Sequence, residues 1–289
     1  MSEKYVYKFD LRITPGKKSI ERFGEIHQVI ANSNYKEVVL DLTEYKYIHP
    51  SFAVLVASSL YLGDMYHKKV LIKYCKTNEK LSLFLKQSGI IAHYSKSTVD
   101  LSELNSKNSS LMFNRFSKLE ETEQTINKIL DTAPISLSQD LRDRLISKFT
   151  EIFSNAFEHG KSSIGVFCCG FINDSNDFSF SVYDAGIGIC TNVNTYLREN
   201  KSCDKALEWA FDKTHSTLNG IVDYPRGAGL NLLESFVKAN AGRIDLTSQG
   251  AYGRIDSNSR NFYNLINPII GTIFSLSIKA DNKHIYVVK

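Results

Sequence analysis

Two polar residues in the middle of the chain are spaced so that they could act on one bound group. Glu151 and Asn155 lie four residues apart in a segment with helical periodicity, so their side chains share one helix face, one turn apart. A carboxylate can act as a general base, and an amide oxygen can bind a metal ion. The alternative is a solvated helix face that ends at Gly160.

A second group of residues follows a stretch with the alternation of a strand. Asp184 comes directly after the apolar segment 178–183 and is followed by Gly186 and Gly188. A carboxylate that leaves a buried strand can accept a hydrogen bond from a base edge, while glycines let the backbone lie against the flat ring. The alternative for this segment is a plain turn.

A third group opens an apolar helical pattern at 230–239. Arg226, Gly227 and Gly229 stand immediately before this pattern. Glycines at a helix N-terminus leave backbone N–H groups free for phosphate oxygens, and the helix dipole adds attraction for negative charge. The three groups together could hold a nucleotide.

The elements that must position these residues fall into two parts. The first part alternates strands and helices, which predicts a small α/β layer domain at 1–105, followed by a polar linker at 106–111. Its strands are expected at 5–13, 36–42 and 69–74, and its helices at 19–30, 51–65 and 79–87.

The second part, at 112–289, has helices followed by strands in hairpin-like pairs. This order predicts an α+β sandwich, in which a mostly antiparallel sheet is covered on one face by helices. The segment 257–267 shows no chemistry that we can assign. Helices are expected at 117–130, 204–211 and 230–239, and a longer helix is expected to run to 157 from a cap at Ser136 or Ser138. Strands are expected at 164–171, 178–183, 243–247 and 272–278.

Four short segments resemble, in order, the sequence boxes of the GHKL ATPases, the superfamily of gyrases, chaperones and histidine kinases. They are 151–160 (EIFSNAFEHG), 184–188 (DAGIG), 227–230 (GAGL) and 271–274 (GTIF). The resemblance covers about residues 112–289. It implies an α/β sandwich that binds ATP with Mg²⁺.

The resemblance also implies roles for individual residues. Asp184 would hold the adenine amino group, Thr272 would support the adenine end, and Asn155 would bind Mg²⁺. The segment 190–225 would form a lid over ATP, with Trp209 more readily explained as a packing residue. The other residues implied in nucleotide binding are Arg226, Gly186, Gly188, Gly227 and Gly229.

The residue at position 151 separates the branches of this superfamily. Its glutamate is similar to that of the hydrolysing members and of the anti-sigma-factor serine kinases, where it can deprotonate water or a substrate hydroxyl. Between Tyr94 and Glu158 the chain has no histidine. We therefore do not expect a histidine kinase that phosphorylates itself.

The first part resembles the STAS fold of anti-sigma-factor antagonists. Ser51 stands where that family carries its phosphorylated serine, but His49, Pro50 and Phe52 replace the neighbouring residues of the family pattern. Ser51 is thus a candidate phosphosite. The alternative is that Ser51 caps the N-terminus of the helix at 51–65.

Composition and charge limit the class of protein. The chain has 43% hydrophobic and 23% charged residues, which is typical of a globular protein, and a net charge of +4 without any basic run beyond two residues. We expect no nucleic-acid partner, no membrane segment and no secretion signal. Five cysteines without a CxxC pair predict reduced thiols and a cytoplasmic location.

These features lead to three functional hypotheses. The first is an Mg-ATP-dependent serine/threonine kinase or ATPase of the anti-sigma type that acts on a STAS-like or other regulatory partner. The second is a switch in which ATP changes homodimerisation or partner binding with little or no catalysis. In the third, the STAS-like part regulates ATP hydrolysis by the second part.

Overall fold

The computed structural model of the 289-residue chain describes residues 4–10, 16–45, 49–74, 81, 85, 112–132, 138–172, 177–212 and 228–279. The first part forms a three-stranded parallel sheet in the order β1-β2-β3, with two helices between the strands in sequence. This confirms a small α/β unit. Its elements are β1 (Lys4–Lys8), α1 (Lys17–Asn32), β2 (Glu37–Asp41), α2 (Pro50–Met65) and β3 (Lys69–Lys73).

The composition of these elements explains where they lie. In α1, apolar residues recur at helical spacing, and Ile20, Phe23, Ile26 and Ile30 are all buried. In α2, by contrast, nearly every residue from Phe52 to Gly63 is buried, so this helix needs apolar neighbours on all sides. The helix expected at 79–87 lies outside the described residues except for two positions, and the linker at 106–111 lies wholly outside them.

The second part forms a seven-stranded sheet in the order β4-β5-β6-β10-β7-β8-β9, with every neighbouring pair antiparallel. This confirms the expected α+β class. The strands are β4 (Met112–Phe116), β5 (Val166–Ile172), β6 (Asp177–Asp184), β7 (Arg243–Ser248), β8 (Ala251–Asp256), β9 (Arg260–Asn264) and β10 (Thr272–Lys279). The helices are α5 (Glu123–Thr132), α6 (Gln139–Asn155), α7 (Gly188–Leu197), α8 (Cys203–Ala210) and α9 (Ala228–Ala239), with a 3-10 turn η2 (Leu119–Glu121) and a π turn η3 (Ala156–Gly160).

Several elements differ from those expected. The strands β4, β8 and β9 and the helix α7 were not predicted, and the helix expected at 117–130 is the turn η2 followed by α5. The segment 257–267 contains β9, which is the edge strand of the large sheet. Of the two serines expected to cap the long helix α6, Ser138 is the cap, and its hydroxyl accepts a hydrogen bond from the Leu141 N–H.

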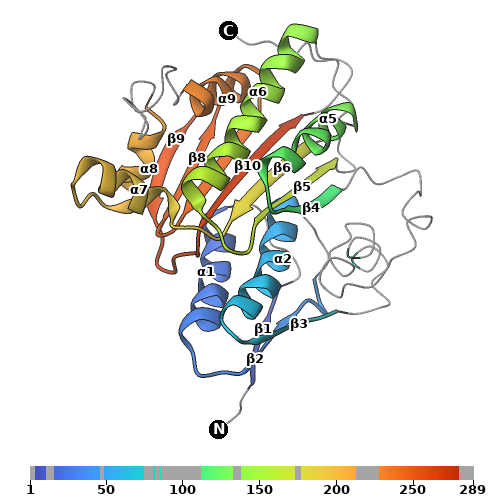
Figure 1. The fold of residues 1–289 in the computed structure, drawn as a ribbon, viewed down its shortest axis with the longest axis vertical. Helices are drawn as coiled ribbons and strands as arrows, with labels where there is room; N and C mark the ends of the chain where they lie inside the picture. The colour runs from blue at the N-terminus through green and yellow to red at the C-terminus, as the bar shows by residue number, and fades with distance from the viewer. Residues whose placement is uncertain are drawn as a thin grey trace.

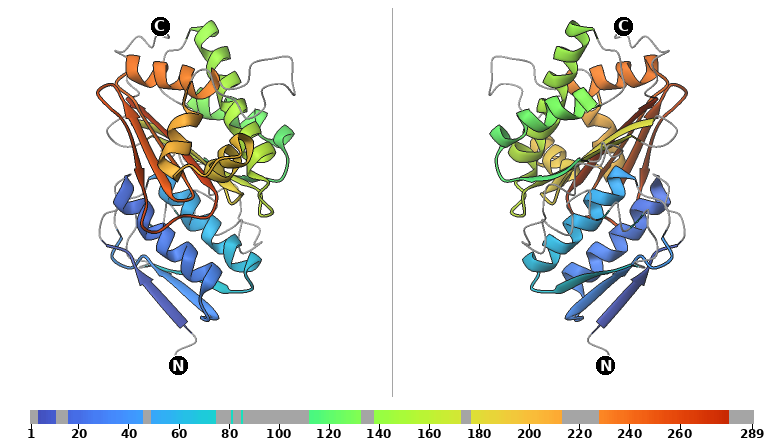
Figure 2. Two further views of the ribbon diagram at one scale, coloured as in Figure 1. Left: turned by 90° about the vertical axis from the view of Figure 1, so that its left-hand side faces the viewer. Right: turned by 90° about the vertical axis from the view of Figure 1, so that its right-hand side faces the viewer.

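Helices cover both faces of the large sheet rather than one. Figures 1 and 2 show α5, α6 and α9 on one face, and α1 and α2 between the other face and the small sheet. One apolar core lies on the first face. A second core joins residues of α1, α2 and the small sheet with residues of the large sheet, such as Phe167, Tyr183 and Ile273. Residues 4–74 and the large sheet therefore share a core.

Candidate functional site

The candidate site centres on Asp184, the last residue of β6. Its side chain faces the same side of the sheet as Phe180 and Val182, because side chains alternate along a strand. Asp184 is only 5% exposed, and burial raises the pKa of its carboxyl to about 7, although the Gly186 N–H lowers it by donating to Oδ1 at 2.9 Å. The other carboxylate oxygen makes no hydrogen bond within the described part of the chain, so it is available to a ligand.

Glycines let three stretches of backbone meet at this carboxylate. A Cβ atom at Gly160 would lie 2.6 Å from Asp184 Oδ1, and one at Gly186 would lie 1.7 Å from the Gly160 carbonyl oxygen. That oxygen instead accepts a hydrogen bond from the Ile187 N–H at 2.9 Å. A larger residue at Gly160 would therefore displace the Asp184 side chain, and one at Gly186 would displace the backbone of Gly160.

Thr272 reaches the same place from the neighbouring strand. It is the cross-strand partner of Asp184 in the pairing of β10 with β6. Its hydroxyl lies 2.9 Å from that of Ser248 on β7, and Ser248 Oγ accepts a hydrogen bond from the Ile189 N–H of α7 at 2.7 Å. The structure thus connects Thr272, Asp184 and the start of α7.

Glu151 and Asn155 lie on the last turns of α6, which leads through the π turn η3 to Gly160. Turns of this kind often occur at functional sites. Asn155 is exposed and Glu151 is partly exposed. Glu151 is not free, because the Lys148 ammonium donates to its Oε2 at 3.0 Å.

The segment expected to form a lid is partly helical. Its first half forms α7 and α8, and α8 packs on β8 and β9. Cys190 on α7 and Cys203 on α8 form a disulfide, so the expectation that all cysteines are reduced is wrong for this pair. The two cysteines are 13 residues apart in sequence, and this separation does not indicate a disulfide; the packing of α7 against α8 brings them together. Cys168 and Cys169 are free and buried in β5.

Of the three residues expected before the helix at 230–239, only Gly229 belongs to the described part of the chain. Arg226 and Gly227 lie outside the described residues, and Gly229 lies in the first turn of α9. Gly188 begins α7 with a φ of +75°, a conformation that favours glycine, and its backbone packs against the Gln249 side chain. Gly188 therefore shapes the backbone between Asp184 and α7.

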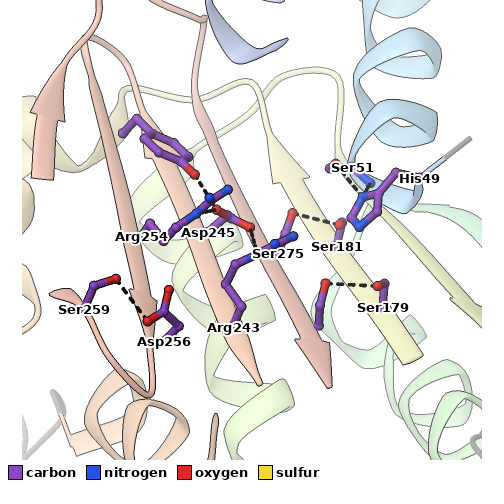
Figure 3. A network of polar contacts seen from close by, with 12 residues as sticks. His49, Ser51, Ser179, Ser181, Arg243, Asp245, Arg254, Asp256, Ser259 and Ser275 are labelled. Carbon is purple, nitrogen blue, oxygen red and sulfur yellow. Dashed lines mark hydrogen bonds and ion pairs between the residues drawn. The ribbon is translucent and has the colours of Figure 1, made fainter. Parts of the chain in front are cut away.

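Ser51 lies on the other side of the large sheet from Glu151. The residue that caps α2 is His49, because His49 Nδ1 accepts a hydrogen bond from the Ser51 N–H at 3.2 Å. The suggestion that Ser51 itself is the cap is therefore wrong. Ser51 Oγ also lies 2.7 Å from His49 Nδ1, and burial lowers the pKa of that imidazole to about 4. Figure 3 shows this pair facing strands β6 and β10.

Near this pair is a polar cluster that the sequence did not reveal. Asp245 on β7 is 8% exposed and accepts hydrogen bonds from Arg243, Arg254 and the Tyr252 hydroxyl (Figure 3). The alternating charged residues on β7 and β8 could have indicated this cluster, but β8 was not predicted, so Arg254 could not be placed beside Asp245. A narrow recess between α1, α2 and this part of the sheet includes His49 and Asp245 in its lining.

Comparison with known proteins adds no family to this description. The chain matches no protein-family model, and no curated protein is significantly similar to it in sequence. Within the ranges that the structure describes, no helix has the length and apolar character needed to span a bilayer. The same residues contain no group of three or more His, Cys, Asp or Glu side chains arranged to bind a metal ion.

Proposed function

We propose that this chain binds Mg-ATP and is an anti-sigma-type serine/threonine protein kinase or ATPase that acts on a STAS-like or other regulatory partner in the cytoplasm. In this proposal residues 112–289 are a GHKL ATP-binding domain and residues 1–105 a STAS-like one. The observation that carries the proposal is the meeting of Gly160, Gly186 and Thr272 at Asp184. These residues come from three of the boxes that resemble the GHKL pattern.

Asp184 would recognise the adenine ring. Its carboxylate oxygen without a partner among the described residues would accept a hydrogen bond from the adenine amino group. The carboxylate is held in place by the Gly186 N–H and by the close backbone of Gly160. Because the site is buried, an amino donor paired with this carboxylate would gain more than it would in water.

Glu151 and Asn155 would act at the phosphate end. Asn155 Oδ1 would hold Mg²⁺ together with phosphate oxygens and water, and the bound metal would offset the negative charge of the phosphates. Glu151 would accept the proton of a serine or threonine hydroxyl, or of water, as that oxygen attacks the γ-phosphorus and ADP leaves. For this role the Lys148 ammonium must release the Glu151 carboxylate.

The contact between Lys148 and Glu151 favours a second candidate function. An ammonium that donates to Glu151 occupies one oxygen of the expected base. A chain in which this pair persists with ATP bound would hydrolyse ATP slowly or not at all. ATP would then act as a switch that changes homodimerisation or partner binding.

The first experiment measures Mg-ATP binding and turnover on the wild-type chain, Asp184→Asn and Glu151→Ala. We expect Asp184→Asn to abolish detectable binding, and Glu151→Ala to keep binding but lose turnover. Asp177→Asn, the same substitution at the other end of β6, is the matched control and should bind ATP normally. Absence of ATP binding by the wild-type chain would overturn the proposal.

Phosphate transfer separates the two candidates. A kinase should transfer labelled γ-phosphate to a STAS-domain protein, and a variant of that protein without the acceptor serine should stay unlabelled. A switch should show a change in mass or partner binding with ATP that survives Glu151→Ala. A mass and partner binding that do not respond to ATP would count against the switch.

A further inference from the structure

The helix α1 lies against the segment 265–271, which leads into β10 and Thr272. The contact is close, because a Cβ atom at Gly24 would lie 2.0 Å from the Asn267 carbonyl oxygen. The residues of α1 that bind this segment recur at helical spacing and so form one face. Three hydrogen bonds join the two: Ile266 N–H to Glu21 Oε1 at 3.3 Å, Gln28 Nε2 to the Pro268 carbonyl at 3.1 Å, and Ile270 N–H to His27 Nδ1 at 3.1 Å.

The same segment contacts the candidate site at its other end. Gly271 has a φ of +82°, and a Cβ atom there would lie 1.9 Å from the Asp184 carbonyl oxygen. The Ile270 carbonyl accepts a hydrogen bond from the Tyr183 hydroxyl at 2.8 Å. His27 and Tyr183 thus hold the N–H and the carbonyl oxygen of the same residue, Ile270, one residue before Gly271 and two before Thr272.

His27 is a costly residue for this position. Its side chain is fully buried, and burial lowers the pKa of the imidazole to about 3, so the ring is neutral. Since Nδ1 accepts from Ile270, the proton is on Nε2, and Nε2 has no hydrogen-bond partner among the described residues. A buried donor without a partner destabilises a fold. Such violations of the usual rules are expected at functional positions.

We propose that His27 is a positioning residue for the nucleotide site. By accepting the Ile270 N–H, it holds Gly271 and Thr272 against Asp184 and so connects α1 to the adenine end of the site. This inference rests on the proposed ATP binding. It makes residues of the first part a component of the site in the second part.

Two substitutions at His27 separate positioning from simple packing. In His27→Asn, the amide Oδ1 can take the place of Nδ1 as the acceptor, whereas His27→Leu fills the space but accepts nothing. We expect His27→Leu to weaken Mg-ATP binding by about tenfold, as loss of one buried hydrogen bond implies, and His27→Asn to stay within about twofold of the wild type. Equal affinities of His27→Leu and the wild type would overturn the proposal.

The control is Ile30→Val, which removes one methyl group from a fully buried residue of the same helix. Ile30 makes no hydrogen bond to the segment within the described residues. We expect Ile30→Val to lower the melting temperature but to leave the affinity for Mg-ATP unchanged. An equal loss of affinity in Ile30→Val and His27→Leu would mean that general destabilisation explains the effect, and the proposal would be wrong.

Amide hydrogen exchange provides a readout that needs no nucleotide. In the free protein, a peptide that covers residues 268–273 should exchange faster in His27→Leu than in the wild type, and at the wild-type rate in His27→Asn. Unchanged exchange in His27→Leu would show that His27 does not hold the segment. If the wild-type chain binds no ATP, the proposed function fails, but the exchange rates still decide whether His27 positions Thr272.

Discussion

The two faces of the large sheet are covered in different ways. Beneath α5, α6 and α9 the buried side chains of the sheet are apolar, such as Phe180 and Phe274, until the strand ends at Asp184. Beneath α1 and α2 the face is apolar near Tyr183 but polar around Asp245 (Figure 3). The first face resembles an ordinary core with a candidate site at its end, whereas the second combines packing with buried hydrogen bonds.

This difference separates the contacts that stabilise the fold from those that determine how a helix is positioned on the sheet. Apolar contacts stabilise any arrangement that excludes water, so they fix the position of a helix only loosely. A buried polar group adds little net stability but penalises arrangements that leave it without partners. Our hypothesis is that the polar groups beneath α1 and α2, including His27 and Asp245, determine how these helices are seated on the sheet.

The largest expected effect tests whether the two faces belong to one cooperative unit. Phe23 on α1 and Phe153 on α6 are both almost fully buried, on opposite faces. We expect Phe23→Ala and Phe153→Ala each to lower the free energy of unfolding by about 3–5 kcal/mol. Because α1 shares a core with the sheet, both variants should shift a single urea transition. It would be followed by circular dichroism and by the fluorescence of Trp209.

Two transitions would contradict this expectation. If Phe23→Ala moved the circular dichroism signal but not the fluorescence of Trp209 on α8, the first part would unfold separately from the sheet. The shared core would then contribute little, and α1 could not position Thr272 in the way that we propose.

The second prediction concerns the single carboxylate at the end of the apolar face. Burial raises the pKa of Asp184 to about 7 from an ordinary value of 3.8, so the folded state favours its protonated form. The resulting stabilisation is complete below about pH 4 and is lost as the pH rises through about 7, which amounts to about 4 kcal/mol. Urea midpoints between pH 5 and pH 8 should therefore fall more in the wild type than in Asp184→Asn.

The same ionisation should appear in ligand binding. An adenine amino group donates to the ionised carboxylate, so the affinity of the wild type for adenosine, which lacks phosphates, should rise with pH through about 7. The control variant Asp177→Asn should show the same rise, because it keeps Asp184. If the urea midpoint had the same pH dependence in the wild type and in Asp184→Asn, and if the wild-type affinity for adenosine did not change between pH 5 and pH 8, Asp184 would not titrate in this range.

Sequence periodicity predicted the elements whose buried residues follow one simple pattern. The helix α1 and the strand β6 are examples, because apolar residues recur every three or four positions in α1 and at every second position from Phe178 to Val182 in β6. The strand β9 (RNFYN) was missed since it is an exposed edge strand without a buried face. The helix α7 was missed because Gly186 and Gly188, at its start, are typical of a turn.

The candidate site could be anticipated only in part. The resemblance to the GHKL boxes named Asp184, Gly186 and Thr272, and the structure brings them together, but their chemical roles remain predictions. His27 could not be found from sequence, because one histidine on an apolar helix face looks like an ordinary core residue. The pairing of Glu151 with Lys148 depends on side-chain rotamers, which no sequence pattern specifies.

The third prediction addresses the polar half of the second face. Asp245→Asn keeps the shape of the side chain but removes the charge that Arg243 and Arg254 contact at 2.7 and 2.9 Å. We expect a loss of about 2 kcal/mol in the free energy of unfolding, less than for a fully buried pair, because both arginines are about one-third exposed and can turn toward water. The urea midpoint measures the loss. An unchanged urea midpoint would mean that the negative charge of Asp245 does not stabilise the fold.

The smallest expected effect on stability compares the loss of one partner of a buried hydrogen bond with the loss of both partners. Ser181 and Ser275 are buried on neighbouring strands, with their hydroxyl oxygens 2.8 Å apart. Either serine-to-alanine variant should lose about 1 kcal/mol of stability because its partner is left without a hydrogen bond, whereas the double variant should be close to the wild type. A double-mutant cycle from urea midpoints measures this coupling.

The pair Ser179 and Ser277, whose hydroxyl oxygens lie 2.9 Å apart and which is less fully buried, is the matched control and should give a smaller coupling. Equal coupling in both pairs would mean that burial does not set the cost, and the polar half of this face would then not specify how α1 and α2 are seated.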